Sequence, residues 1–236
     1  MRKIILFCLV GCMLFSLCAC STTESSGSFE DNAKGTATTD SKLVAEDTTT
    51  TDTIGVDEVS YSTTVLEDLK DSYLAEITVE NYGVITLKLD STVAPITVSN
   101  FVTLANDGFY DGLTFHRIMD GFMMQGGDPL GTGMGGSDVE IKGEFMANGV
   151  ENTISHKRGV ISMARAYDMN SASSQFFIVH EDSEFLDGNY AGFGEVISGM
   201  EVVDAICSSS QPIDDNGTIP AESQPIITSI VIKEVE

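Results

Sequence analysis

Apolar and polar side chains alternate over residues 75–90, on both sides of the turn-forming sequence Asn81-Tyr82-Gly83. The apolar positions are Ile77, Val79, Ile85, Leu87 and Leu89. Successive side chains of a strand point to opposite faces, so this pattern buries one face of each strand. The segment therefore predicts a β-hairpin.

Two later segments have the spacing of amphipathic helices. The first begins at Pro95, which suits the first turn of a helix, and ends at Gly108. Its apolar residues at helical spacing are Val98, Phe101, Val102 and Ala105. A second, shorter helix is predicted from Gly199 to Cys207, with Met200, Val203 and Ile206 on one side.

Short β-like runs separated by clusters of Gly, Asp and Asn account for much of the remaining sequence. They cover residues 114–118, 159–163, 175–179, 191–197 and 226–235. Many short strands with turns between them favour a barrel or a sandwich over a regular alternation of strands and helices. We expect residues 73–236 to form one mainly β domain.

The N-terminus has the pattern of a secretory signal. Two basic residues precede an unbroken apolar stretch, residues 4–17, which is too short to span a membrane comfortably. The sequence Leu17-Cys18-Ala19-Cys20 that ends it resembles the lipobox of bacterial lipoproteins. This resemblance implies a signal peptide of residues 1–19, a lipidated Cys20 and anchoring to the outer face of a bacterial cell membrane. An ordinary signal peptide cut nearby is the alternative.

Residues 20–72 are rich in Ser, Thr, Asp and Glu and nearly free of aromatic residues, so they predict a disordered acidic tether. A solvated tail without a role has the same composition. The net charge of −24 disfavours binding to nucleic acid or directly to an anionic membrane surface. Four of the five cysteines lie within the first twenty residues, so no disulfide framework is expected.

The common catalytic and cofactor motifs are absent from the sequence. His116, His156 and His180 have no metal-ligand spacing, and we predict no metal and no cofactor. The sequence from Gly131 to Gly136 satisfies G-x-G-x-x-G, but it follows Asp128-Pro129 and does not join a strand to a helix. A dinucleotide site is therefore not expected there.

A run of large apolar residues with one cation and one amide extends from Phe115 to Asp128. Together with three later segments it resembles the signature of the cyclophilin family of peptidyl-prolyl isomerases. The segments are Phe115-His116-Arg117-Ile118-Met119-Asp120-Gly121-Phe122-Met123-Met124-Gln125-Gly126-Gly127-Asp128, Gly159-Val160-Ile161-Ser162-Met163-Ala164-Arg165-Ala166, Ser173-Ser174-Gln175-Phe176-Phe177-Ile178, and residues 185–196 with Phe185-Leu186-Asp187-Gly188 and Phe193-Gly194-Glu195-Val196.

The resemblance implies a closed eight-stranded antiparallel barrel capped by two α-helices, with a groove on its outside. It makes Arg117 the catalytic side chain, Gln125 its neighbour on the substrate backbone, and Phe122 part of the pocket for the proline ring. The further substrate-binding residues that it implies are Met123, Phe177 and Leu186 in that pocket, Ala164, Arg165, Ala166 and Gln175 along the groove, and Phe185 and Tyr190 at the rim.

The predicted activity is cis/trans isomerisation of prolyl bonds in unfolded or partly folded secreted polypeptides, by a chain that we expect to be a monomer. Phe185 stands where well-studied family members carry tryptophan, which predicts weak sensitivity to cyclosporin. Arg165 and Tyr190 also depart from the common family residues, so substrate preference stays open. Two alternatives remain: a proline-peptide-binding module with little turnover, and an adhesin or scaffold on a stalk.

Overall fold

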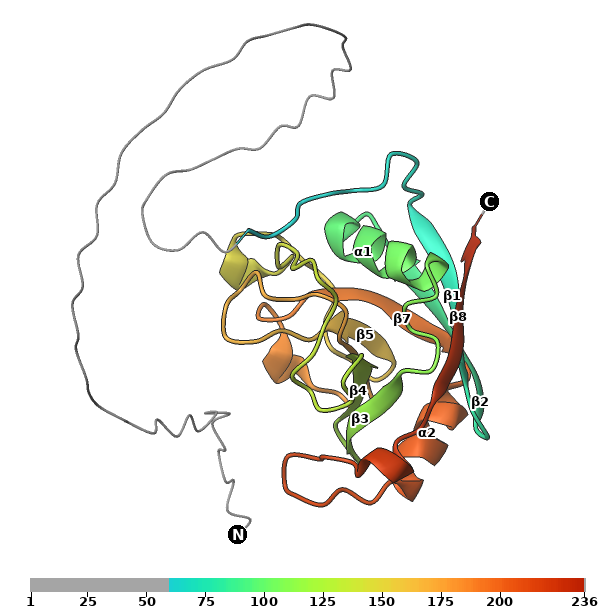
Figure 1. Cartoon of the computed structure of the whole chain (residues 1–236). Helices are drawn as coiled ribbons and strands as arrows, with labels where there is room; N and C mark the ends of the chain where they lie inside the picture. Colours follow the sequence, from blue (N-terminus) through green and yellow to red (C-terminus); the bar gives the residue numbers. More distant parts are fainter. Residues whose placement is uncertain (1–59, 236) are drawn as a thin grey trace, which may run out of the picture. The chain divides into compact units, whose positions relative to one another are not determined.

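Figure 1 shows the computed structural model, which describes residues 60–235. The predicted signal peptide, the lipidation at Cys20 and most of the predicted tether lie outside these residues. Within residues 60–235, no helix is both long enough and apolar enough to cross a membrane.

Eight antiparallel strands form one curled sheet in the order β3-β4-β6-β5-β7-β2-β1-β8. The strands are β1 (Ser72–Val79), β2 (Gly83–Asp90), β3 (Thr114–Met119), β4 (Met123–Asp128), β5 (Val160–Met163), β6 (Phe176–Val179), β7 (Gly192–Ser198) and β8 (Ile227–Glu234). The predicted hairpin is confirmed as β1 and β2. Asn81 in its turn has φ 63°, a left-handed conformation that Asn adopts more readily than most residues.

The two end strands of this order, β3 and β8, approach each other without forming a full ladder. Thr114 makes an isolated antiparallel bridge to Ile226, just before β8. Further along β3 the loop of residues 213–219 takes the neighbouring place, since Ile118 N donates to Gly217 O over 2.8 Å. Eight antiparallel strands with two helices are therefore confirmed, but closure of the barrel is not: the sheet is an open, curled half-barrel.

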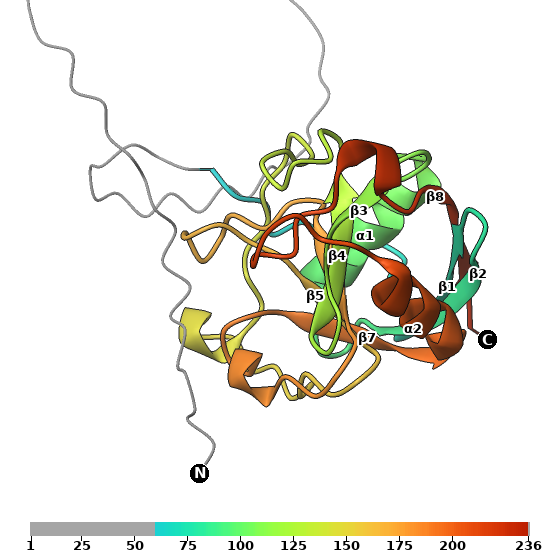
Figure 2. The same cartoon turned by 90° about the horizontal axis from the view of Figure 1, so that it is seen from below.

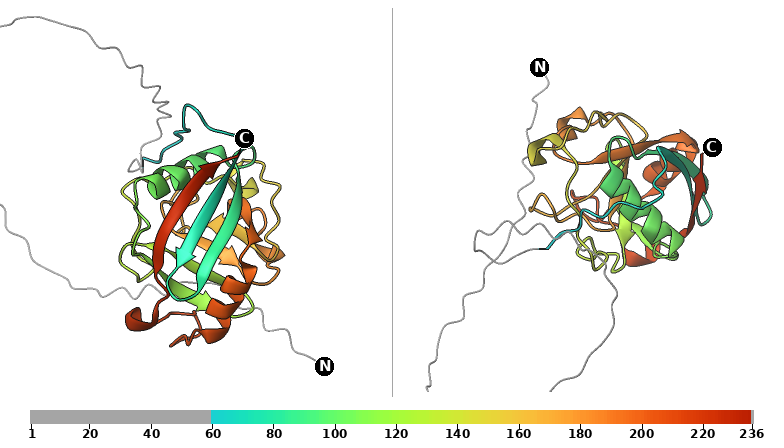
Figure 3. Two further views of the ribbon diagram at one scale, coloured as in Figure 1. Left: turned by 90° about the vertical axis from the view of Figure 1, so that its right-hand side faces the viewer. Right: turned by 90° about the horizontal axis from the view of Figure 1, so that it is seen from above.

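The two helices lie at opposite ends of the curled sheet (Figures 1 and 3), and the view from below shows α2 in front (Figure 2). They are α1 (Pro95–Asn106), which packs against β8 and β2, and α2 (Met200–Ser209), which packs against β2 and β4. Short 3-10 turns cover Met146–Asn148, Glu184–Leu186 and Ala221–Ser223. Both predicted helices are confirmed.

The N-terminus of α1 is capped from a distant loop. Ala94 at the N-cap has no side-chain acceptor, and the buried carboxylate of Glu144 accepts from the backbone N–H groups of Ile96 and Thr97 over 3.0 and 2.7 Å. A carboxylate at this end also interacts favourably with the helix dipole. Glu144 therefore ties α1 to the loop before β5.

The two faces of β4 and β6 pack into two different apolar clusters. Met124, Phe176 and Ile178 point into the main core inside the half-barrel. Their neighbours Met123, Phe177 and Val179 belong to a second cluster on the opposite face. Because side chains alternate between the faces of a strand, one run of residues serves both clusters. We call the second one the outer cluster. It consists of Met123, Val160, Phe177, Val179 and Leu186, with Met119, Phe122, Ile154, Ala164 and Tyr190 partly buried against it.

The folded part begins earlier than the sequence predicted. Ser62 N donates to Glu140 O over 2.7 Å, and Lys142 N donates to Ser62 O over 2.9 Å. Leu66 and Leu69 pack against the main core. Contacts with the folded part therefore extend to Ser62, before the boundary predicted at residue 73. The sequence could not indicate this, because the contacts join segments far apart in the chain.

Candidate functional site

Arg117 of β3 lies half-buried beside the outer cluster, with its guanidinium held from three sides. Its Nε donates to the backbone oxygen of Asn216 over 2.7 Å, and Nη1 donates to Gln125 Oε1 over 3.3 Å. The guanidinium carbon is 5.9 Å from the centre of the Phe122 ring. Burial lowers the pKa of Arg117, while Tyr190 and Asp214 act to raise it. An arginine still stays charged at neutral pH, so this is a fixed cation in a partly desolvated place.

A chain of amide groups continues from Arg117 along the sheet. Gln125 Nε2 donates to Gln175 Oε1 over 2.8 Å, and Gln175 Nε2 donates to the backbone oxygens of Gly133 and Gly135 over 3.1 and 2.7 Å. These bonds fix which end of each amide is oxygen and which is nitrogen. The orientation of Gln125 therefore depends on the loop of residues 131–136.

The apolar surface next to Arg117 is made by the outer cluster. Met123, Phe177 and Leu186 are almost fully buried, and Phe122 and Tyr190 are half-buried against them. The Tyr190 ring stands edge-on to Phe177 at 5.9 Å between centroids. Phe185 is 69% exposed and lies 5.5 Å from the Phe122 ring. Part of this apolar surface is therefore accessible, at the half-buried Phe122 and Tyr190 and the exposed Phe185.

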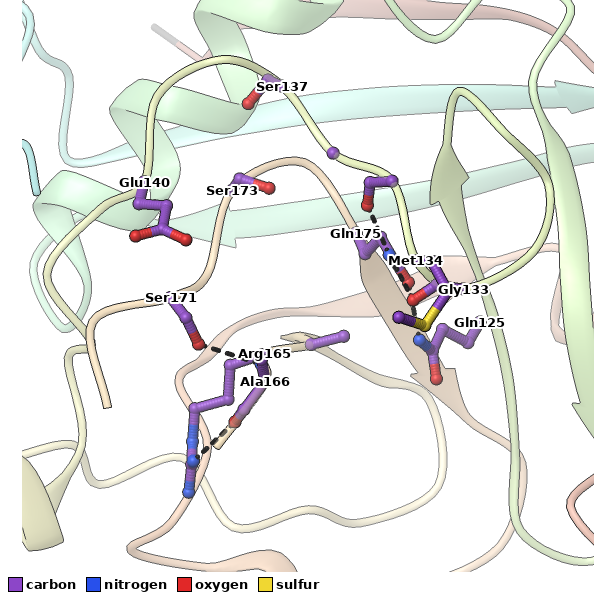
Figure 4. A pocket seen from close by; sticks show the side chains of 13 residues that line it. Gln125, Gly133, Met134, Ser137, Glu140, Arg165, Ala166, Ser171, Ser173 and Gln175 are labelled. Atoms are coloured by element: carbon purple, nitrogen blue, oxygen red, sulfur yellow. Dashed lines mark hydrogen bonds between the residues drawn. The ribbon is translucent and has the colours of Figure 1, made fainter. Parts of the chain in front are cut away.

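A polar pocket of about 310 Å³ adjoins the amide chain (Figure 4). Gln125 and Gln175 point toward each other on one side of it, and the Arg165 guanidinium on another side turns away from them. Its guanidinium carbon lies 5.1 Å from the Phe145 ring centre and 5.0 Å from that of Tyr190. Cations are attracted to aromatic faces at such distances. Other lining residues include Ala164, Ala166, Glu140, Ser171 and Ser173.

Arg165 also joins two walls of the groove. Its Nε donates to Asn189 O over 3.1 Å, and its Nη1 donates to the backbone oxygens of Ala166 and Tyr167 over 3.1 and 3.2 Å. These bonds connect the segment after β5 to the segment before β7. The side chain therefore holds these two segments together beside the pocket.

The G-x-G-x-x-G sequence folds around a carboxylate of the protein itself. Asp128, at the end of β4, accepts from the backbone N–H groups of Leu130, Thr132 and Gly133 over 2.8, 2.9 and 2.6 Å. Burial alone would raise the pKa of Asp128, but these donors, together with Gly135, outweigh it and lower the pKa. In this structure the N–H groups of the segment are bound to Asp128 and not to a phosphate-like group.

A Ser–His–Asp arrangement lies beneath the outer cluster. His156 Nδ1 is 2.8 Å from Asp187 Oδ1, its Nε2 is 3.0 Å from Ser162 Oγ, and its ring stacks on Phe177 at 6.0 Å. His156 and Ser162 are completely buried, so no substrate can reach the hydroxyl. Burial lowers the pKa of His156 despite the nearby Asp187. The group is a support for the floor of the groove and not a nucleophilic centre.

The sequence reasoning missed the loop that holds Arg117 from the far side. Asp214 Oδ1 accepts from the backbone N–H groups of Asn216 and Thr218, each over 3.0 Å, which forms a tight turn. Gly217 in this turn has φ 87°. The turn aims the Asn216 carbonyl at Arg117 Nε. Asp, Asn and Gly are common in turns of every kind. The sequence therefore did not indicate that Asp214, Asn216 and Gly217 lie next to Arg117.

The sequence-predicted residues lie together along the outside of the half-barrel. Hydrogen bonds connect Arg117, Gln125 and Gln175, the outer cluster holds the apolar residues, and Phe185 lies at the exposed rim. Arg165 and Ala166 line the adjoining pocket. The roles of these residues stay predictions. No group of three or more His, Cys, Asp or Glu suited to a metal occurs between residues 60 and 235.

Comparison with protein families gives a match that spans nearly the whole folded part. Residues 74–235 match the family model described as cyclophilin type peptidyl-prolyl cis-trans isomerase/CLD. The match includes every predicted site residue except Cys20.

Curated relatives and solved structures agree with this match. The chain is 48% identical over 122 residues to peptidyl-prolyl cis-trans isomerase B of Bacillus subtilis, covering 52% of this chain and 82% of that protein. It is 46% identical over 145 residues to an isomerase of Helicobacter pylori, covering 59% and 86%. A crystal structure of a cyclophilin type isomerase from Cryptosporidium parvum, in the presence of the dipeptide Ala-Pro, is 31% identical with a TM-score of 0.60. It covers 69% of this chain and 99% of that one.

Proposed function

The chain belongs to the family of cyclophilin-type peptidyl-prolyl cis-trans isomerases, and we propose that Arg117 stabilises the twisted prolyl bond of a polypeptide bound in the groove. Prolyl cis/trans isomerisation is the activity of the chain. The observation that carries the proposed mechanism is the half-buried Arg117 guanidinium, held by Asn216 and Gln125 beside the outer cluster.

The electronic change in the peptide bond explains why a fixed cation suits this reaction. Resonance between nitrogen and carbonyl makes the barrier to rotation about 18 to 20 kcal/mol. The twisted bond loses this resonance, and its nitrogen becomes a better hydrogen-bond acceptor than in either isomer. A donor directed at that nitrogen therefore stabilises the transition state more than the ground states. Arg117 needs no proton transfer, and the reaction needs no covalent intermediate.

The apolar groove supplies the rest of the rate enhancement. An acceleration of roughly 10⁴- to 10⁶-fold corresponds to about 5 to 8 kcal/mol. One charge-assisted hydrogen bond contributes about 1.5 to 3 kcal/mol. We infer that Phe122, Met123 and Phe177 hold the proline ring while the flanking carbonyl rotates, and that Gln125 binds the substrate backbone. The Ala-Pro dipeptide present with the Cryptosporidium parvum relative supports a proline-containing ligand.

A protease-coupled assay with a proline peptide tests the role of Arg117. Arg117→Ala is expected to lower kcat/KM about 10- to 100-fold with peptide affinity largely retained. Arg117→Lys keeps the charge but loses the planar fork of donors, so we expect only partial activity. An Arg117→Ala variant as active as the wild type would contradict the mechanism. A wild type at the uncatalysed rate that still binds the peptide would favour the non-catalytic binding module.

We also propose that the enzyme assists the folding of secreted or surface proteins while anchored by a lipid on Cys20. This proposal is supported by the signal-like residues 4–17 and the lipobox-like sequence before Ser21. Two acyl chains are enough for stable anchoring. The test is mass spectrometry of the mature N-terminus together with membrane fractionation of the wild type and Cys20→Ser. A wild type cut elsewhere and released as a soluble protein would contradict the anchoring.

A further inference from the structure

The turn between β3 and β4 carries Phe122, and a residue outside the groove holds this turn. Gly121 N donates to the side-chain Nδ1 of His180 over 2.9 Å. The backbone N–H of His180 donates in turn to Phe122 O over 2.8 Å. Gly121 has φ 77°, a conformation that few other residues adopt at low cost. His180 follows the end of β6. It thus binds the turn twice, at the N–H of Gly121 and at the carbonyl oxygen of Phe122.

The surroundings of His180 select one tautomer of its ring. Its Nε2 lies 3.0 Å from Asp204 Oδ1 on α2, and a carboxylate can only accept a hydrogen bond. The proton of the neutral ring is therefore on Nε2, which leaves Nδ1 free to accept from Gly121. Arg158 fixes this carboxylate because its Nη2 lies 2.7 and 2.8 Å from the two oxygens of Asp204. Arg158 Nη1 also donates to the backbone oxygen of His180 over 2.8 Å.

We propose that His180 is a positioning residue for isomerisation, which sets the place of Phe122 beside Arg117 through its Nδ1 acceptor. The path runs from α2 through Asp204 and His180 to Gly121, and from there to the ring that lies 5.9 Å from the Arg117 guanidinium carbon. His180 is 8% exposed and does not belong to the outer cluster. The inference rests on the proposed role of Phe122 at the site.

Asp120 of the same turn also lies near the ring, since its Oδ1 is 3.4 Å from Nδ1. An ionised carboxylate cannot donate a hydrogen bond, so the Gly121 N–H is the donor to Nδ1. The turn therefore depends on His180 for this acceptor.

Two amide substitutions separate the two ring nitrogens. In His180→Asn the amide oxygen takes the place of Nδ1, since both are bonded to Cγ, and it can accept from Gly121. In His180→Gln the amide nitrogen takes the place of Nε2 and can donate to Asp204, but the acceptor for Gly121 is lost. Lys233→Met is the control, because it removes an exposed ion pair to Glu76 between β8 and β1, on no element of the site.

The experiment measures kcat/KM on the full chain at pH 8, with thermal unfolding of each variant. At pH 8 we expect His180→Gln to lose about three- to tenfold in kcat/KM, and His180→Asn and Lys233→Met to stay within about twofold of the wild type. This separates positioning from general stability, because both His180 variants disturb the same buried place.

A double-mutant cycle tests whether the effect passes through Phe122. If it does, His180→Gln should change the residual activity of Phe122→Ala by less than about twofold. An equal loss in both backgrounds would overturn the inference, and so would a His180→Asn variant that loses as much activity as His180→Gln. A wild type without activity would overturn the isomerase function itself, and the inference with it.

Discussion

The inner and outer faces of β4 and β6 differ in what their side chains contact. On the inner face Phe176 is completely buried and meets the rings of Phe101, Tyr110 and Phe115 at 5.5 to 6.0 Å between centroids. On the outer face its neighbour Phe177 packs in a smaller cluster, with His156 beneath it and Tyr190 beside it.

The inner face of these two strands contributes mainly to stability, and the outer face carries the polar groups proposed to act in the reaction. Inner residues contact apolar atoms on all sides, so their contribution is burial and close packing. Outer residues combine apolar side chains with half-buried amides and a cation, which are costly to desolvate unless they are hydrogen-bonded. The hydrogen bonds of Arg117, Gln125 and Gln175 meet this condition.

The largest expected contrast is between Phe176→Ala and Phe177→Ala. Truncating Phe176 leaves an enclosed cavity and should lower the free energy of unfolding by about 3 to 5 kcal/mol. Truncating Phe177 opens a space that solvent can enter, so we expect a loss of about 2 kcal/mol but most of the isomerase activity gone. Chemical denaturation and the peptide assay measure both. Equal losses in the free energy of unfolding for the two variants would contradict the proposed difference between the two faces.

A smaller effect is expected from the turn that faces Arg117. In Gly217→Ala the new Cβ would be 2.8 Å from Ile118 O and would also clash with Met119. We expect a loss of about 2 kcal/mol in the free energy of unfolding and about five- to tenfold in kcat/KM, because the Asn216 carbonyl moves away from Arg117.

Gly149→Ala is the matched control for this turn. Gly149 also has positive φ, at 75°, but a Cβ there meets nothing within 4 Å. It should cost about 1 kcal/mol from backbone strain alone, with unchanged activity. If both glycine variants had the same activity, the proposed dependence of Arg117 on the Asn216 carbonyl would be wrong.

The pH dependence of stability sharpens the comparison further. Burial lowers the pKa of His156, under the outer face, and of His116 in β3. The unfolded chain then binds more protons than the folded one as the pH falls below the ordinary histidine pKa of 6.5, so the free energy of unfolding decreases from pH 7 to 5. Denaturation of the wild type and His156→Asn at pH 7, 6 and 5 should show a flatter dependence in the variant. A wild-type stability that rises toward pH 5 would contradict this.

The smallest effect is expected at the exposed rim. Phe185→Trp adds an indole donor beside Phe122 without disturbing buried contacts, so stability should not change. We expect weak cyclosporin binding by the wild type and about tenfold tighter binding by the variant, which corresponds to one added hydrogen bond. Fluorescence titration measures both affinities. Nanomolar binding by the wild type would refute the prediction.

Local patterns were enough to predict most elements of the fold. The hairpin of β1 and β2 and the two helices follow from periods of two and 3.6 residues, which the local sequence displays directly. β4 was not predicted as a strand, although its residues were identified as part of the site. β4 is nearly buried on both faces, so its sequence does not alternate between apolar and polar residues. It also contains Gly126, where an added Cβ would lie 2.7 Å from Thr114 O, and glycine has a low strand propensity.

The sequence by itself determined seven of the eight strands and the family resemblance, and it supplied the predicted set of site residues, because these depend on residue type and order. Only the tertiary structure decided that the sheet stays open between β3 and β8, that Glu144 caps α1, and that Asn216 and His180 hold the site from outside. Each of these contacts joins segments tens of residues apart. A hydrogen bond depends on where both partners lie in space, and no local periodicity records that for Asn216 or His180.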